Sequence, residues 1–141
     1  MASIEEDPAI PEPVAVIENE LAEAIYNLVN EERTAKGLNT LAYEFKLQEA
    51  ADLRAKEASE AFSHTRPNGT SCYTVFPEDY INAGENLIMS DIQIATADIL
   101  MKTWMDSPGH RDNILSNKYS AISIGIYTKD NVVYASQLFI G

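Results

Sequence analysis

Apolar residues recur at helical spacing in two stretches of the first half of the chain. The first stretch runs from about Ile17 to Gly37, which supplies a stop. The second runs from Leu47 to Phe62 and ends near Ser63. Their apolar positions are Leu21, Ile25, Leu28 and Val29 in the first, and Leu47, Ala51, Ala55, Ala58 and Phe62 in the second. The pattern predicts two amphipathic helices, and the small side chains of the second predict a close approach to a neighbouring element.

The middle of the chain switches from a strand-like to a helix-like pattern. Residues 80–89 form a short apolar run that predicts a strand, and residues 92–105 fit a third helix. Ser107 followed by Pro108 is typical of a new helix start, with the serine hydroxyl as N-cap. We therefore expect a short fourth helix that runs to about Leu115, and a cost of about 0.5–2 kcal/mol for replacing the capping serine with alanine.

The C-terminal residues alternate twice and predict a β-hairpin. Residues 121–127 and 132–140 form its strands, and residues 128–131 form the turn. Both sets of alternating positions in the second strand are largely apolar, so both faces of the sheet need cover from helices. The sequence therefore predicts an α+β fold, a three-layer α-β-α sandwich around a mainly antiparallel sheet.

Composition narrows the classes of function. The chain has 141 residues, of which 45% are hydrophobic, enough for one compact domain. Its formal net charge of −12 excludes a nucleic-acid backbone as partner. No stretch approaches the roughly 20 apolar residues of a membrane-spanning helix, so the chain is not expected to span a membrane.

The N-terminal segment differs from the rest of the chain. Residues 1–16 contain three prolines and several acids, which favours an extended, solvated linker or a remnant of recombinant expression. The Met-Ala-Ser start has no basic or apolar region of an export signal, and a trimmed exported protein would look the same. We expect residues 17–141 to form the domain.

Two histidines are the first candidates for chemistry. His64 lies where the second helix passes into a turn-forming segment, residues 64–73. His110 lies in the first turn of the helix that Ser107 and Pro108 begin, where the helix dipole disfavours the charged imidazolium. A neutral ring is the form that binds a metal or accepts a proton, and the hydroxyl of Ser107 shares a helix face with it.

Glu85 is the third candidate, because it interrupts an apolar run and a buried acid must be paired or coordinated. The preceding Gly84 permits a bulge or the close approach of another group. A structural ion pair of Glu85, for instance to Arg111, is the alternative to a functional role. Cys72 is alone, which excludes an intramolecular disulfide and a Cys-rich metal site, and we interpret it as a small buried hydrophobe.

Five segments of the chain form a recognisable series. They are LVNEERTAKGLNTL (28–41), FSHTRPNGT (62–70), GENL (84–87), WMDSPGHRDNIL (104–115) and YASQLF (134–139). In this order they resemble the CAP superfamily of cysteine-rich secretory, antigen 5 and pathogenesis-related 1 proteins (the SCP domain), in its bacterial branch. The resemblance runs from about Leu21 to Gly141, and the fold that it implies agrees with the sandwich above.

The resemblance implies a central cleft with two His and two Glu. His64, Glu85 and His110 match three of these positions, whereas the fourth carries Ser107, with Asp106 one residue away. The family's disulfides are missing, and GHRDN stands at 109–113 in place of a GHYTQ-type stretch, so lipid or sterol binding is not implied. Because bacterial relatives are exported or surface-attached, we expect an extracellular or cell-surface setting.

Two hypotheses of function follow. The first is a non-catalytic binding module whose cleft holds Zn²⁺ or another divalent metal through His64, His110 and Glu85, and whose partner is a protein, peptide or cell-surface ligand. The alternative is a metal-assisted hydrolase in which Glu85 acts as the base. A weaker idea makes Ser107 a nucleophile with His110 as its base, but no nucleophile-elbow motif supports it.

Overall fold

The computed structural model describes residues 15–141, so the expected linker falls almost entirely outside the described residues. The helices are α1 (Glu20–Ala35), α2 (Gln48–Glu60), α3 (Ala97–Met105) and α4 (Pro108–Ile114), with short 3₁₀ segments η1 (Phe45–Leu47) and η2 (Cys72–Val75). The strands are β1 (Ala42–Tyr43), β2 (Ala83–Asp91), β3 (Ala121–Lys129) and β4 (Val132–Ile140).

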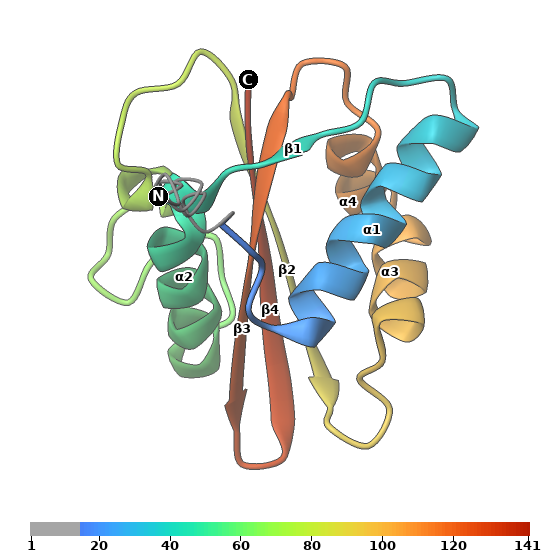
Figure 1. The fold of residues 1–141 in the computed structure, drawn as a ribbon. Coiled ribbons are helices and arrows are strands. Elements are labelled where there is room, and N and C mark those ends of the chain that lie inside the picture. Colours follow the sequence, from blue (N-terminus) through green and yellow to red (C-terminus); the bar gives the residue numbers. More distant parts are fainter. Residues whose placement is uncertain (1–14) are drawn as a thin grey trace, which may run out of the picture.

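The strands form one sheet between two helical layers. Their order is β1-β3-β4-β2, in which β4 is antiparallel to both β2 and β3, and β1 is parallel to β3. Helix α2 covers one face of the sheet, and α1, α3 and α4 cover the other (Figure 1). The predicted three-layer sandwich is confirmed, with a sheet that is mixed because of the two-residue β1.

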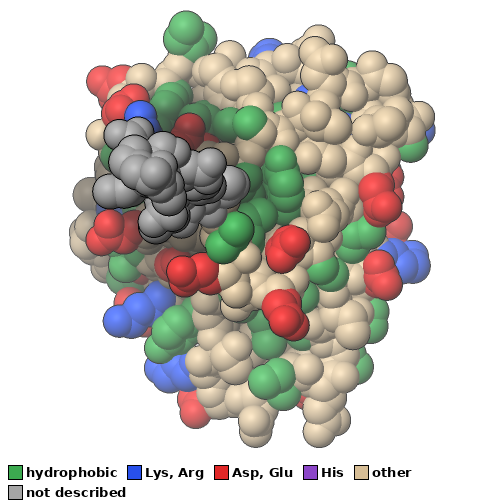
Figure 2. All heavy atoms as spheres, viewed as in Figure 1, with side chains coloured by type: hydrophobic (Ala, Val, Ile, Leu, Met, Phe, Trp, Pro, Cys, Tyr) green, Lys and Arg blue, Asp and Glu red, His purple; other side chains and the backbone are tan. Residues whose placement is uncertain are grey.

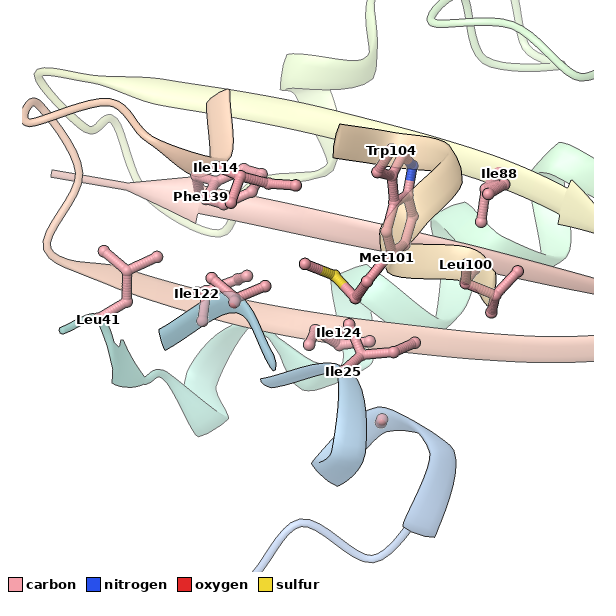
Figure 3. Close-up of a cluster of buried hydrophobic side chains, with 13 residues drawn as sticks. Ile25, Leu41, Ile88, Leu100, Met101, Trp104, Ile114, Ile122, Ile124 and Phe139 are labelled. Atoms are coloured by element: carbon pink, nitrogen blue, oxygen red, sulfur yellow. The ribbon is translucent and has the colours of Figure 1, made fainter. Parts of the chain in front are cut away.

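Each face of the sheet has its own apolar core. Trp104, Ile25 and Phe139 are fully buried between the sheet and the layer of α1, α3 and α4 (Figure 3). On the opposite face, Leu138 packs with Leu47 beneath α2. Neighbouring residues of β4 therefore point into different cores, which confirms that the hairpin strands are buried on both faces.

Charge is spread over the surface around these cores. On the face seen in Figure 2, carboxylate side chains are scattered among apolar and basic ones and do not gather in one patch. None of the helices described for residues 15–141 has the length and apolar character that crossing a membrane requires.

Helix α2 approaches the sheet closely, as its small side chains predict. A Cβ atom placed on Gly125 of β3 would lie 2.0 Å from the carbonyl oxygen of Ala51 in α2. The same carbonyl accepts a hydrogen bond of 2.7 Å from the hydroxyl of Ser136 in β4. Glycine at one contact and a small hydroxyl at the other let the helix backbone lie against the strands.

Two predicted boundaries are wrong. Strand β2 is shifted toward the C-terminus and ends at Asp91, whose carboxylate accepts a hydrogen bond from Gln93 N at 2.8 Å and turns the chain. Helix α3 begins at Ala97, not at residue 92, because the hydroxyl of Thr96 caps it by accepting from Ile99 N at 3.2 Å.

The position of Ser107 as N-cap of α4 is confirmed, but its hydroxyl makes no capping hydrogen bond. The expected cost of 0.5–2 kcal/mol is therefore corrected: Ser107→Ala should change the free energy of unfolding by less than about 0.5 kcal/mol. Thr96→Ala, which removes a hydroxyl that does cap a helix, should cost about 1 kcal/mol. Urea denaturation of both variants checks this, and equal losses would contradict it.

Candidate functional site

His64 lies in a loop held by its own backbone. Its carbonyl oxygen accepts a hydrogen bond from Cys72 N at 2.8 Å. Between these residues the chain reverses in a tight turn, where Gly69 has a φ of +87° and Gly69 N donates to Arg66 O at 2.8 Å. The predicted turn thus returns the chain to His64 and places Cys72 beside it.

His64 and Glu85 meet although 21 residues separate them. Nδ1 of His64 lies 2.9 Å from Oε1 of Glu85, whose side chain is 1% exposed against 60% for the imidazole. A carboxylate paired with a guanidinium accepts hydrogen bonds, so Nδ1 of His64 donates to Glu85. The Nε2 atom of His64 is consequently the nitrogen available to a metal or a partner.

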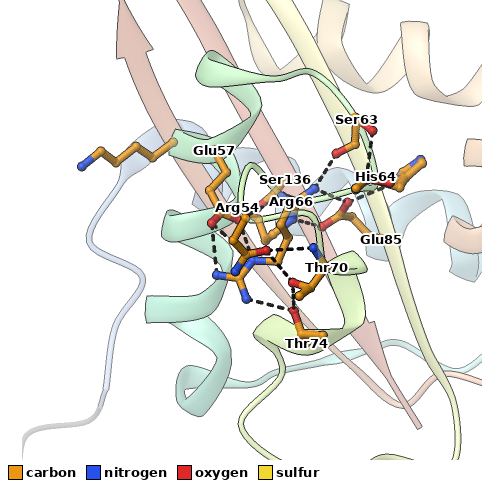
Figure 4. A network of polar contacts seen from close by, with 12 residues as sticks. Arg54, Glu57, Ser63, His64, Arg66, Thr70, Thr74, Glu85 and Ser136 are labelled. Atoms are coloured by element: carbon orange, nitrogen blue, oxygen red, sulfur yellow. Dashed lines mark hydrogen bonds and ion pairs between the residues drawn. The ribbon is translucent and has the colours of Figure 1, made fainter.

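The buried ion pair of Glu85 is formed with Arg54 of α2, and the interpretation with Arg111 is wrong. Nε of Arg54 lies 2.7 Å from Oε2 of Glu85, and Nη2 lies 2.9 Å from Oε1 (Figure 4). Arg111 lies on α4 and donates a long hydrogen bond of 3.5 Å to the carbonyl of Met105. Both oxygens of Glu85 are therefore engaged, one of them twice.

A second acid extends this network toward the turn. Glu57 accepts from Arg54 Nη1 at 3.0 Å and from Arg66 Nε at 2.9 Å. Burial alone would lower the pKa of Arg54, but the hydrogen bonds and charges of Glu85 and Glu57 outweigh it and raise that pKa. Burial would raise the pKa of Glu57, but Arg66 and Arg54 hold it below its ordinary value.

His110 faces the same side of the molecule as His64. The two histidines line one small pocket of about 110 Å³, together with Phe62, Ser63 and Leu87. Burial, followed by the proximity of His64, lowers the pKa of His110. This direction favours the neutral imidazole, but its causes are burial and His64 and not the helix end that the sequence suggests.

Side chains from two of the sequence motifs connect α4 to β2 through hydrogen bonds. The buried amide of Asn86 donates to the carbonyl of His110 at 3.1 Å and accepts from Asn113 Nδ2 at 2.9 Å. Trp104 Nε1 donates to the carbonyl of Leu87 at 3.1 Å. The GENL segment and the WMDSPGHRDNIL segment are thus joined by hydrogen bonds into one structural unit.

Gly84 permits the close approach of another side chain, as the sequence suggests. A Cβ atom there would lie 2.2 Å from the hydroxyl of Tyr119, and that hydroxyl donates to Asn113 Oδ1 at 3.4 Å. The close approach keeps the tyrosine against the start of β2, next to Glu85.

Cys72 takes part in a group that sequence reasoning missed. Among residues 15–141, the one group of at least three side chains with metal-ligand atoms within 4.8 Å of one another consists of His64, Cys72 and Glu85. The thiol is buried, and burial followed by the charge of Glu85 raises its pKa. A neutral thiol is a weak ligand, so Cys72 behaves as the buried side chain that we expected. His110 lies outside this group.

The remaining two candidates lie farther from the imidazoles. Ser107 caps α4, and Asp106 accepts from Lys102 Nζ at 2.8 Å with a side chain 66% exposed. Neither residue lines the 110 Å³ pocket or the larger cleft of about 460 Å³ beside it. That cleft is lined by His64, Thr65, Ser71, Cys72, Tyr73, Glu85 and Asn113.

The fold and this cleft define a class of protein, and comparison with known proteins agrees. The model of the cysteine-rich secretory protein family (CAP) matches residues 26–140, so the chain belongs to this family. The uncharacterized protein YkwD of Bacillus subtilis is 30% identical over 136 residues, which cover 93% of this chain and 49% of YkwD. The chain thus spans about half the length of this relative.

Solved structures share the fold. An extracellular protein of Bacillus anthracis that contains an SCP domain superposes with a TM-score of 0.75 at 21% identity, covering 91% of this chain and 45% of that one. The structure of NaASP2 with Zn²⁺ superposes with a TM-score of 0.66 at 15% identity, covering 90% and 82%. These likenesses show that the chain shares the fold of CAP proteins.

Proposed function

We propose that the chain is an extracellular or cell-surface binding module whose cleft holds a divalent cation between His64 and His110. The observation that carries the proposal is the pair of histidines that line one pocket, with Nδ1 of His64 engaged by Glu85 so that Nε2 is the nitrogen available to a metal. In metal sites, a ligating histidine commonly donates its other N–H to a carboxylate, which fixes the ring. The ion would supply a positive centre with open positions for a partner's donor atom.

Glu85 fits this site as the acid behind His64 and not as a ligand. The sequence interpretation includes it among the ligands, but Arg54 occupies both of its oxygens. A metal bound directly by Glu85 would have to displace a guanidinium from a buried ion pair, which is costly. Two imidazoles can accept a metal without disturbing any hydrogen bond given above.

The same ion pair argues against hydrolysis. A general base must be able to take a proton from water, directly or through one intervening water. The carboxylate of Glu85 is 1% exposed and held by Arg54, and Ser107 stands where the resemblance implies a second acid. Among the described residues that line the cleft, the one acid is thus held in an ion pair, which favours a non-catalytic module that binds a protein, peptide or cell-surface ligand.

Calorimetric titration with Zn²⁺ tests this function. We expect wild-type chain to bind one equivalent and the His64→Ala, His110→Ala double variant to show no binding at the same concentrations. Asp106→Asn, which neutralises an exposed acid outside the cleft, is the matched control and should bind like wild type. Undiminished binding by the double variant would assign the affinity to surface carboxylates and refute the proposal.

Affinity should also fall steeply as the pH is lowered. Protons compete with the metal for imidazole nitrogens, whose ordinary pKa is about 6.5, so most of the affinity present at pH 7.5 should be gone at pH 5.5. Carboxylate sites titrate near pH 4 and would lose far less over this range. Titrations at both pH values distinguish the two, and pH-independent binding would contradict a histidine site.

A further inference from the structure

We infer that Arg54 is a positioning residue that sets the tautomer of His64 through Glu85, an inference that rests on the proposed binding role of His64. Arg54 is fully buried and lies in the middle of α2, with its guanidinium pointing at the network in Figure 4. Arg54 reaches the ring through Glu85, because its Nη2 and Nδ1 of His64 both contact Oε1 of that carboxylate.

The guanidinium joins three segments of the chain. Besides the two bonds to Glu85 of β2 and the bond to Glu57 of α2, its Nη2 donates to the carbonyl of Ser63 at 2.7 Å. Ser63 precedes His64, so the group that holds the carboxylate also holds the backbone from which the imidazole projects. One side chain thus places both partners of the His64–Glu85 hydrogen bond.

Arg54 determines how the carboxylate is presented to His64. Its Nε holds Oε2 at 2.7 Å and its Nη2 holds Oε1 at 2.9 Å, so the carboxylate has one fixed orientation. In that orientation Oε1 lies 2.9 Å from Nδ1 of His64 and accepts its hydrogen bond, which leaves Nε2 as the outward nitrogen. Loss of the two-point contact would release the carboxylate from this orientation and remove the preference for the Nδ1–H tautomer.

The planar shape of the Arg54 guanidinium makes this contact possible. The two-point contact with Glu85 and the bond to Ser63 use three N–H directions of a planar fork, which a lysine ammonium does not reproduce. Arg54→Lys keeps the positive charge but loses this geometry. We expect it to fold and to hold His64 in a mixture of tautomers.

Nitrogen-15 NMR of the metal-free full chain at pH 8 tests the inference, because the Nδ1 and Nε2 shifts of a neutral ring report which atom carries the proton. Wild type should show the Nδ1–H form, and Arg54→Lys a mixture with a large Nε2–H fraction. Arg33→Lys is the matched control, since Arg33 is also buried but bonds the carbonyls of Asn39, Ile114 and Ser116. It should leave His64 unchanged.

An unchanged Nδ1–H tautomer in Arg54→Lys would overturn the inference, as would an equal change in Arg33→Lys. If Arg54→Lys alone unfolds, combining it with the stabilising Gly109→Ala substitution provides the folded sample. In the same samples, Arg54→Lys should weaken Zn²⁺ binding about tenfold. This is the lower end of the loss of affinity that is usual when a residue supporting a metal-binding histidine is replaced. Failure of wild type to bind Zn²⁺ would refute the proposed function but leave the tautomer result to decide the role of Arg54.

Discussion

Replacing Arg54 with methionine should lower the free energy of unfolding by about 3–5 kcal/mol, because it leaves a buried carboxylate without its partner. The carboxylate of Glu85, whose side chain is 1% exposed, would lose both contacts with Arg54 and keep the hydrogen bond from His64, whereas Glu57 would keep Arg66. A loss of this size is a large share of the stability of a small domain. Urea denaturation at pH 7 measures it.

An exposed ion pair provides the control for that experiment. Lys102 lies on α3, and Asp106 directly follows the end of this helix. Nζ of Lys102 and Oδ2 of Asp106 are 2.8 Å apart, and the two side chains are 76% and 66% exposed. Lys102→Met should cost no more than about 0.5 kcal/mol, because solvent screens such pairs. If Arg54→Met proved as mild as Lys102→Met, the buried network would not be a stabilising feature of the site.

Replacing Gly125 with alanine should cost about 3 kcal/mol or more. The new Cβ would lie 2.0 Å from the carbonyl oxygen and 2.6 Å from the next backbone nitrogen of α2. A helix backbone cannot yield as a flexible side chain can, so α2 must move away from the sheet and lose packing around Leu47 and Leu138. Thermal or urea denaturation measures the loss.

Gly109 is the matched control within the same chain. It lies inside α4, and a Cβ there would have nothing within 4 Å. Gly109→Ala should therefore stabilise the protein by about 0.5–1 kcal/mol, since it reduces the freedom of the unfolded chain without a clash. Similar losses at Gly125 and Gly109 would show that the close approach of α2 does not limit residue size.

Much of the fold could be predicted because its signals are local. The 3.6-residue period of α1 and α2 and the two alternating segments of the hairpin each depend on neighbours within one element. Strand β1 could not be predicted, because its two residues are too few to show a periodic pattern of apolar positions. Its position is set by the backbone pairing of Ala42 with Ala121, a contact between distant parts of the chain.

The sequence could predict which residues belong to the site, but not which residues they contact. An acid in an apolar run and a histidine at a helix start identify Glu85 and His110 as unusual, but no spacing reveals their partners. A signal for Arg54 does exist: it lies three residues after Ala51 and four before Ala58, on the buried stripe of α2. A cation on that stripe requires a buried acid, and Glu85 is such an acid.

X-ray absorption spectroscopy of the zinc-loaded protein tests the central claim most directly, because it reports the atoms bound to the metal. We expect Zn–N distances of about 2.0–2.1 Å from two imidazoles, lost together in the His64→Ala, His110→Ala double variant, and no sulfur ligand. A Zn–S distance of about 2.3 Å would place the ion on Cys72, within the group of His64, Cys72 and Glu85, and would contradict a site built on the two histidines.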